Sequence, residues 1–258
     1  MIKFLKELKK TKAMSSYNTF AYFYDALTQN VEYETRSNYI YSFFENSNIK
    51  SGTVLDLACG TGSMSLPFME KGYNIVGIDC SEQMLEVASS KFLQRGNNFS
   101  LLKAEMQNFR LESHIDACIC CLDSVNHLNK ASDVKKTFEN VYTSLKENGL
   151  FVFDVNTVYK HNSILSDNTF VFDEENFYLV WDNETIDDRT VRILLDIFVY
   201  NGSSYDRFSE EFEETAYTVE ELTKMLTNTG FKNISVYDEL SLNAPKENSE
   251  RIYFVCKR

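Results

Sequence analysis

The chain has 258 residues, of which 43% are apolar and 25% are charged, ordinary values for a globular protein. With only 2 prolines and 9 glycines, long linkers and low-complexity segments are not expected. This length suits one large domain, or one domain with an insertion. The formal net charge of −12 has the wrong sign for a surface that binds nucleic acid, so a nucleic-acid partner is not expected.

The sequence also argues against a membrane or secreted protein. No stretch approaches the roughly 20 apolar residues of a membrane-spanning helix. The N-terminal sequence MIKFLKELKKTKAM is basic, but Glu7 and scattered lysines interrupt its apolar run, so it does not fit a secretory signal. The six cysteines fall mostly in apolar runs without histidines at ligand spacing, which favours buried, reduced thiols over disulfides or zinc. We therefore expect a cytoplasmic protein.

Five apolar runs alternate with helical patterns through the first 156 residues. They are TVLDLAC (53–59), YNIVGID (73–79), FSLLKAE (99–105), IDACICC (115–121) and LFVFDVN (150–156). Runs that are apolar on both faces are typical of parallel strands covered on both sides. Ser81 and Ser132 are predicted to cap two of the intervening helices. This alternation predicts an α/β fold with a doubly wound, Rossmann-like, mostly parallel sheet and helices on both faces.

The pattern changes after Asn156. From about residue 168 to 215, strand-like segments are joined by Asp, Asn, Gly and Ser turns, which indicates a small antiparallel insertion. Thr218 and Glu221 then form a capping box before another helix, and two closing strands bring the main sheet to seven. The predicted organisation is a main domain of residues 1–160 and 216–258, with 1–50 as an N-terminal helical cap, interrupted by an insertion or lid at 161–215.

The sequence VLDLACGTGS at 54–63 places a strand, a glycine turn and a helix in succession. Such a turn presents backbone N–H groups at the carboxyl edge of the sheet, where open α/β folds bind ligands. Gly60 and Gly62 permit a sharp turn and a close approach of the ligand. Nineteen residues after Gly60, the second strand ends in Asp79, which is placed to accept hydrogen bonds from ribose hydroxyls. A cofactor that contains a nucleoside is therefore predicted.

Two residues point away from a dinucleotide and its oxidoreductase chemistry. The third glycine of a G-x-G-x-x-G motif is replaced by Ser65, and Asp56 would repel a pyrophosphate from inside the first strand. A buried carboxylate is costly unless the site uses it. Asp56 suits a cofactor with a cationic part, such as S-adenosyl-L-methionine (SAM), whose ammonium group it could face directly or through water.

The motifs DLACGTG, GID, SEQML and AEM resemble those of the class I SAM-dependent methyltransferases, from FAYFYDAL (20–27) to the last strand. CCLDSVNHL, FVFDVNTVYK and the acidic insertion resemble a bacterial small-molecule subgroup with a β-rich lid after strand five. The resemblance implies a glycine turn at the methionine part of SAM, Asp79 at the ribose, and an N-terminal segment folded over the cofactor. Core packing is the competing interpretation for Met84 and Met106. The predicted cofactor-binding residues are Tyr17, Tyr24, Asp56, Ala58, Gly60, Thr61, Gly62, Asp79, Cys80, Met84, Glu105, Met106 and Leu122.

Methyl transfer from a sulfonium is an in-line displacement that depends on orientation and exclusion of water, and a strong base is optional for an amine. His127 is the candidate base because its unperturbed pKa lies near neutrality, although a helix-flanking role competes. His161 forms no ligand pattern with it, and no acid cluster indicates a metal. The predicted acceptor-binding residues follow strands four and five: Asp123, Asn126, Asn156 and Tyr159.

Residues 166–215 contain fourteen Asp or Glu and three Arg, which favours a cationic or amine-bearing acceptor; a solvated outer face is the competing interpretation. The sequence thus predicts a methyltransferase that converts SAM to S-adenosyl-L-homocysteine (SAH) and methylates nitrogen or oxygen of a small molecule, with nitrogen favoured. An RNA or protein methyltransferase and a non-catalytic SAM-binding protein stay open as alternatives. The N-P-P-Y type of signature expected for base-amine methylation is absent, and CLDSVN stands in its place.

Overall fold

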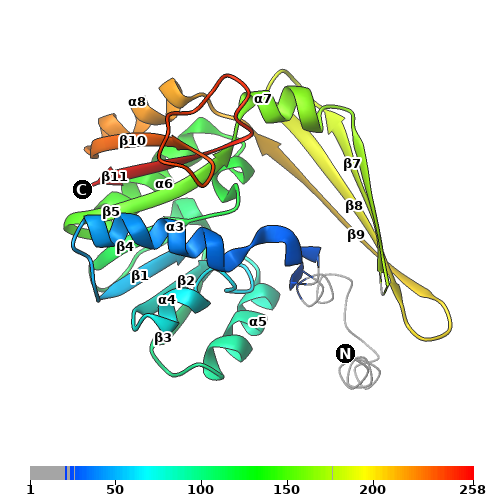
Figure 1. Ribbon diagram of the computed structural model, residues 1–258, viewed down its shortest axis with the longest axis horizontal. Helices are drawn as coiled ribbons and strands as arrows, with labels where there is room; N and C mark the ends of the chain where they lie inside the picture. The colour runs from blue at the N-terminus through cyan, green and yellow to red at the C-terminus, as the bar shows by residue number, and fades with distance from the viewer. Residues whose placement is uncertain (1–20, 22–23, 26, 176) are drawn as a thin grey trace.

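The computed structural model describes residues 21, 24–25, 27–175 and 177–258, and its centre is a seven-stranded sheet (Figure 1). The strand order is β10-β11-β5-β4-β1-β2-β3, with β11 antiparallel to both of its neighbours and the other pairs parallel. This confirms the predicted doubly wound, mostly parallel sheet. The strands are β1 (Thr53–Leu57), β2 (Asn74–Asp79), β3 (Phe99–Lys103), β4 (Ile115–Cys120), β5 (Leu145–Asn156), β10 (Lys232–Asp238) and β11 (Arg251–Lys257).

Helices cover both faces of this sheet because its strands are apolar on both sides. One buried layer includes Phe138 and Leu222 from the helices of one face, and the other includes Phe44 and Phe92 from the helices of the opposite face. None of the described helices is both long and apolar enough to cross a membrane. The first layer contains α6 (Ala131–Ser144) and α8 (Val219–Thr229), and the second contains α3 (Tyr33–Asn46), α4 (Leu66–Glu70) and α5 (Glu82–Leu93).

Two of the three predicted helix starts are confirmed. Ser81 Oγ accepts a hydrogen bond from the backbone N–H of Met84 at 3.3 Å, and Thr218 and Glu221 form the full capping box of α8. The predicted cap at Ser132 is wrong, because α6 begins at Ala131 and Ser132 already lies inside its first turn. Local sequence therefore places this helix correctly but misses its first residue, which no side chain caps.

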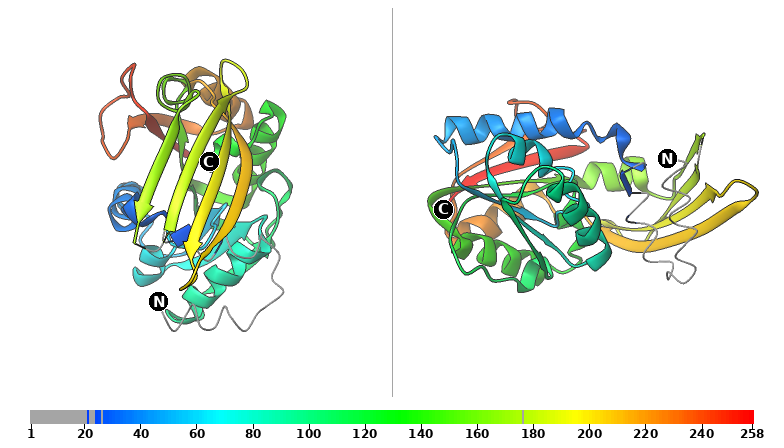
Figure 2. Two further views of the ribbon diagram at one scale, coloured as in Figure 1. Left: turned by 90° about the vertical axis from the view of Figure 1, so that its right-hand side faces the viewer. Right: turned by 90° about the horizontal axis from the view of Figure 1, so that it is seen from below.

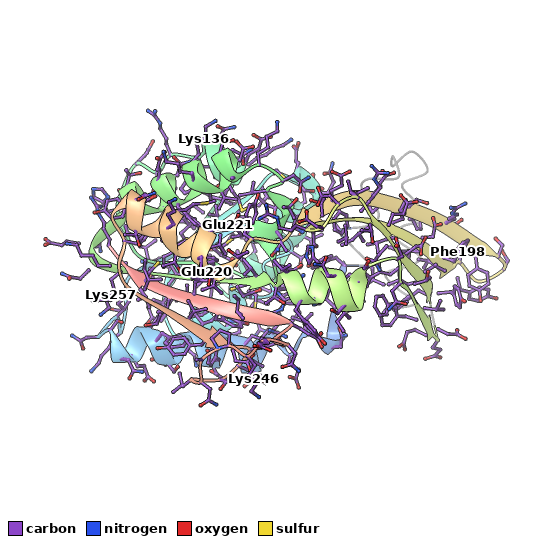
Figure 3. All side chains as sticks on the ribbon, turned by 90° about the horizontal axis from the view of Figure 1, so that it is seen from above. Lys136, Phe198, Glu220, Glu221, Lys246 and Lys257 are labelled. Carbon is purple, nitrogen blue, oxygen red and sulfur yellow. The ribbon has the colours of Figure 1, made fainter. Side chains whose placement is uncertain are left out.

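The predicted antiparallel insertion is a separate four-stranded sheet in the order β6-β7-β8-β9 (Figure 2). The chain enters it through α7 (Val158–Lys160) and one turn of π-helix, η4 (His161–Leu165). The long strands carry Phe198 far from the main sheet (Figure 3), while the end of β9 returns to the carboxyl edge of that sheet. Its strands are β6 (Thr169–Glu174), β7 (Phe177–Thr185), β8 (Thr190–Tyr200) and β9 (Tyr205–Thr215). Its action as a lid stays a prediction.

Candidate active site

The glycine turn after β1 uses its two glycines for different reasons. Both have positive φ angles, 52° for Gly60 and 77° for Gly62. A Cβ atom at Gly62 would stand 2.5 Å from Cζ of Phe92 in α5, so this glycine lets the turn pack against the helix. A Cβ atom at Gly60 would meet no described atom within 4 Å. The side of the turn at Gly60 is therefore open to a ligand.

This contrast predicts different effects of alanine at the two positions. Gly62→Ala should lower the free energy of unfolding by roughly 2–4 kcal/mol, because a left-handed backbone conformation and a clash with Phe92 add together. Gly60→Ala should cost only the backbone strain, about 1–2 kcal/mol, but its methyl group should obstruct a ligand. Urea unfolding and calorimetric titration with SAM would measure both effects. Equal losses of stability in the two variants would contradict this account.

Asp79 joins the end of β2 to the glycine turn. Its Oδ2 accepts from the backbone N–H of Gly60 at 2.8 Å, and its Oδ1 accepts from that of Ser81 at 2.8 Å. Burial raises the pKa of Asp79, while these two hydrogen bonds oppose the shift. Each oxygen keeps a further lone pair, so the carboxylate can fix the turn and still receive a ribose hydroxyl.

Asp56 has a partner inside the protein. The residue is 2% exposed, and its Oδ2 accepts a 2.6 Å hydrogen bond from the hydroxyl of Ser65. Burial raises the pKa of Asp56 to about 7, although the Ser65 hydrogen bond opposes this change. The serine at the third glycine position thus satisfies the buried acid and fixes the start of α4. A contact between Asp56 and an ammonium group stays a prediction.

The remaining predicted cofactor residues gather at the carboxyl ends of β1 to β4. Cys80 follows β2 at the carboxyl edge of the sheet and is exposed, so the expectation of buried thiols is wrong for this cysteine. All six cysteines are free. Ala58 and Leu122 have positive φ angles in the turns after β1 and β4. Met84 and Met106 are half-buried, whereas Glu105 is exposed and accepts hydrogen bonds from the side chains that follow it.

The N-terminal segment reaches this edge through a residue that sequence reasoning missed. Asp25 Oδ1 accepts from the hydroxyls of Thr61 at 2.6 Å and Ser63 at 3.0 Å, and its Oδ2 pairs with Lys91. The sequence FAYFYDAL carries no motif that signals this contact. Thr61 is thereby 1% exposed, and its hydroxyl already has an acceptor within the chain. The segment that was expected to cover the cofactor thus docks on the glycine turn.

Tyr24 lies beside the same turn, and Tyr17 lies outside the described residues. The pKa of Tyr24 is raised, chiefly by burial and then by Tyr33, Asp123 and Asp79. The phenol is therefore close to both Asp79 and the loop after β4. A predicted cap over residues 1–50 can be assessed only from residue 21 onward, where α3 packs on the main sheet.

Three side chains from distant parts of the chain form what we call the acceptor cluster: Asp123, His127 and Glu214. One polar atom from each lies within 4.8 Å of the other two. Asp123 follows β4, His127 ends the short 3-10 helix η3 (Ser124–His127), and Glu214 comes from β9 of the insertion. The His127 side chain is 42% exposed, but the surrounding protein removes enough water from the imidazole to lower its pKa, while Asp123 and Asp79 act to raise it. Sequence reasoning missed Glu214 because only the return of β9 brings it here.

Arg251, another residue missed from sequence, neutralises the buried acids behind this cluster. Its guanidinium group lies 2.5 Å from Asp123 Oδ1 and also pairs with Asp154, which is fully buried. Burial would raise the pKa of Asp123, but the charge of Arg251 outweighs it and holds this pKa well below its usual range. Asp154 also accepts from the backbone N–H groups of Leu122 and Asp123 at 2.8 and 2.9 Å. Asp123 thus stays ionised.

The other predicted acceptor residues differ in their placement. Asn126 is fully buried, and its amide bonds the backbones of Asn156 and Thr215, so it ties the η3 turn to β5 and β9. Asn156 donates to Glu214 Oε2 at 3.3 Å and accepts from Lys160 Nζ at 3.0 Å. Tyr159 is half-buried in α7. Asn126 and Asn156 therefore surround the cluster and position it.

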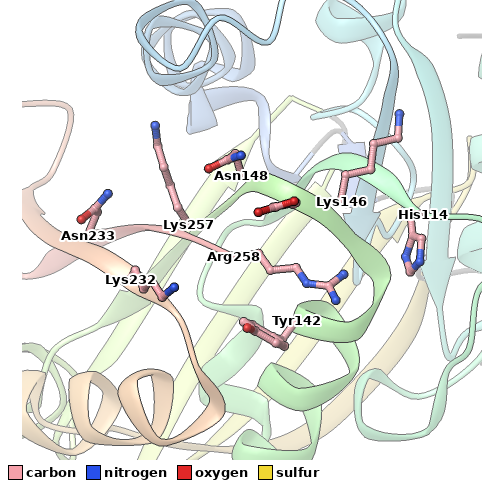
Figure 4. Close-up of a pocket in the computed structure, with 9 residues that line it drawn as sticks. His114, Tyr142, Lys146, Asn148, Lys232, Asn233, Lys257 and Arg258 are labelled. Carbon is pink, nitrogen blue, oxygen red and sulfur yellow. The ribbon is translucent and has the colours of Figure 1, made fainter.

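A surface pocket of about 540 Å³ lies at the opposite edge of the main sheet, away from the glycine turn (Figure 4). Its lining includes Lys146 at the start of β5, Lys232 at the start of β10 and Arg258 after β11. Because these residues stand at the amino edge of the parallel strands, the pocket is separate from the cofactor edge and the acceptor cluster.

A strand, a glycine turn and a carboxylate at the end of the next strand, on a doubly wound sheet, are the features of α/β proteins that bind nucleoside-containing cofactors. Residues 54–149 match a family model described as a methyltransferase domain. The protein named "Putative methyltransferase YqeM" of Bacillus subtilis (strain 168) is 34% identical to this chain over 244 residues, which cover 94% of this chain and 97% of YqeM. The chain belongs to the SAM-dependent methyltransferase family, and SAM is its cofactor.

Two further similarities frame the site. A crystal structure of a SAM-dependent methyltransferase from Clostridium acetobutylicum ATCC 824 is 34% identical, with a TM-score of 0.86, and the match covers 94% of this chain and 99% of that one. The glycine/sarcosine N-methyltransferase of Parasynechococcus marenigrum (strain WH8102) is 35% identical over 107 residues, or 40% of this chain and 37% of that enzyme. The fold match therefore includes the insertion, whereas the second match is confined to part of the chain.

Proposed function

We propose that the protein transfers the methyl group of SAM to the nitrogen of a small-molecule amine in the cytoplasm. The observation that carries this proposal is the acceptor cluster, which sets two carboxyl groups and an imidazole beside the cofactor edge. A nitrogen at the centre of three atoms spaced by up to 4.8 Å lies about 2.8 Å from each, the length of a charge-assisted hydrogen bond. The cluster is thus shaped for an amine or ammonium group.

Charge around the cluster supports the same choice of acceptor. Among the described residues, Asp123, Asp154 and Glu214 lie near the cations Arg251 and Lys160, and Glu239 and Glu250 add further carboxyl groups beside them. The insertion adds acid on its surface, which attracts cations and repels phosphates. The partial similarity to a glycine/sarcosine N-methyltransferase is consistent with an amine acceptor.

The bound cofactor would supply an electrophilic methyl group on a sulfonium. Asp79 and the glycine turn would hold it, and Asp25 would keep the N-terminal segment on that turn. Asp123, held ionised by Arg251, would orient the amine by accepting one of its N–H groups. His127 would accept another, which leaves the nitrogen lone pair free for in-line attack. Orientation of this kind can supply much of the rate acceleration.

The test is turnover of SAM to SAH with a panel of small amines and with the alcohols of the same carbon skeletons, read by mass spectrometry. We expect methylation of amines and not of the matched alcohols. Asp123→Asn should lower kcat/KM about 10- to 100-fold, because a charge-assisted hydrogen bond is lost. Asp206→Asn removes an equal charge from an exposed position of β9 and should leave turnover unchanged. Methylation of the alcohols alone would overturn the proposal.

A further inference from the structure

His161 has a nitrogen whose hydrogen-bonding state the structure defines. The imidazole is fully buried, and its Nδ1 lies 2.9 Å from the backbone carbonyl oxygen of Arg189. Because a carbonyl oxygen only accepts, Nδ1 carries the proton and Nε2 of the neutral ring carries a lone pair. That Nε2 has no hydrogen-bond partner among the described residues. A buried acceptor of this kind requires a donor.

Glu214 is the group that faces this lone pair. Its Oε2 lies 3.7 Å from His161 Nε2, and its Oε1 lies 3.7 Å from His127 Nε2 on the acceptor side. The residue is 3% exposed, and Asn156 donates to the same Oε2. An ionised carboxylate would set its own lone pairs against that of His161. A single proton shared by the two groups replaces this repulsion with a hydrogen bond. A small side-chain rotation is enough to shorten the 3.7 Å separation to hydrogen-bond length.

The charged groups around Glu214 come from several elements and partly cancel. Asp123 after β4 favours a proton on it, whereas Arg251 of β11 and Lys160 of α7 oppose one, and His127 of η3 faces it as a neutral ring. Burial is the largest influence and, with Asp123, raises the pKa of Glu214 to about 8. Burial also lowers the pKa of His161. The raised pKa of Glu214 and the lowered pKa of His161 both place the shared proton on Glu214.

We propose that Glu214 and His161 form a proton-holding pair at the acceptor cluster, and that Glu214 takes the proton that the acceptor's ammonium group must lose. This inference rests on the proposed function. An ammonium group that binds displaces the pair's proton to solvent, and the freed carboxylate then takes one proton from the nitrogen. The nitrogen lone pair forms the new N–C bond while the C–S electron pair leaves with sulfur. The product departs as a methylated ammonium, and Glu214 is left protonated for the next cycle.

Two fixed cations oppose a divalent metal in the same place. The guanidinium group of Arg251 occupies Asp123 Oδ1, and Lys160 adds a second positive charge near Glu214. A divalent ion would stand beside both cations, which repel it, whereas a proton or one ammonium group brings a single charge. The cluster is therefore better matched to a singly charged group.

The first test counts protons released on binding, by calorimetry near pH 7 in buffers of different ionisation heats. The probes are SAH and sinefungin, an analogue whose amine replaces the methylated sulfonium. For the wild-type protein, sinefungin should release up to one proton more than SAH, because its ammonium group displaces the proton of Glu214. In Glu214→Gln this difference should vanish, since the amide can still donate to His161 but has no proton to lose. Glu213→Gln, at the neighbouring half-buried position whose carboxylate pairs with Arg192 instead, should keep it.

A second test needs no ligand. The raised pKa of folded Glu214 means that its contribution to stability is full below about pH 4.5 and is lost as the pH rises through about 8. The unfolding midpoint of the wild-type protein should therefore fall relative to that of Glu214→Gln between pH 5 and 9, but not relative to that of Glu213→Gln. Parallel pH profiles, or equal proton release with both probes, would overturn the pair. Failure to bind SAH or sinefungin would instead overturn the SAM site, and tight binding of zinc or manganese would show a metal site.

Discussion

Replacing Asp79 with alanine is expected to weaken SAM binding by about 1–3 kcal/mol, or roughly tenfold to hundredfold. The carboxylate holds the backbone N–H groups of Gly60 and Ser81 and keeps lone pairs for a ribose. Its loss removes the direct contact and also releases the turn from the end of β2. Calorimetric titration with SAM measures the change in affinity directly.

Asp116 offers a matched control for that experiment. Its Oδ2 accepts from the backbone N–H of Thr53 at 2.8 Å, much as Asp79 does for Gly60, and it pairs with Lys146. It stands at the opposite edge of the sheet, near the start of β1. Asp116→Ala should therefore lower stability without changing SAM affinity. An Asp79→Ala protein that binds SAM as tightly as the wild type would remove Asp79 from the cofactor site.

Replacing Arg251 with methionine is expected to lower the free energy of unfolding by about 3–5 kcal/mol near pH 8. The side chain is 11% exposed and is the shared partner of Asp123 and fully buried Asp154, so both carboxylates would lose their cation. The loss should shrink towards pH 5, because an unpaired buried carboxyl group can take up a proton. Urea unfolding at the two pH values measures both effects.

Arg192 provides the comparison for an exposed network. It lies within 3.4 Å of Glu184, Glu211 and Glu213 on the surface of the insertion, and its side chain is 35% exposed. Surface pairs contribute about 0–1 kcal/mol, so Arg192→Met should have a small effect in spite of its three partners. If the Arg192 and Arg251 variants lose equal stability, burial does not set the strength of these ion pairs.

The cofactor site and the acceptor cluster depend on the insertion to different extents. We expect binding of SAM to depend on β1, β2 and the N-terminal segment, whereas the acceptor cluster is complete only when Glu214 of β9 reaches Asp123 and His127. Leu27 packs with Leu179 and Ile197 of the insertion, so the segment that holds the glycine turn also contacts this sheet. The N-terminal segment around Asp25 and Leu27 thus contacts both the glycine turn of the cofactor site and the insertion that carries Glu214.

The sequence by itself determined the features that depend on local pattern. Apolar runs on both faces predicted the buried strands, Ser81 and Thr218 marked two helix starts, and the spacing from Gly60 to Asp79 predicted a carboxylate beside the glycine turn. These features follow from backbone geometry and from short-range spacing, which the chain carries in consecutive residues. The family resemblance rests on the same motifs.

Only the tertiary structure decided which polar groups meet at the acceptor side. Glu214 lies 87 residues beyond His127, and Arg251 reaches Asp123 and Asp154 because β11 pairs with β5 in a register that sets Arg251 opposite Asn156. The hydrogen bond from Thr61 to Asp25 is likewise a long-range contact, which no periodic pattern in the sequence predicts. The sequence also gives no sign of the buried lone pair on His161 Nε2. The tautomer and the neighbour of this nitrogen are set by the carbonyl oxygen of Arg189 and the carboxyl group of Glu214, which only folding brings close. Long-range pairing, register and burial determine these contacts, and so they determine the chemistry that we propose for the site.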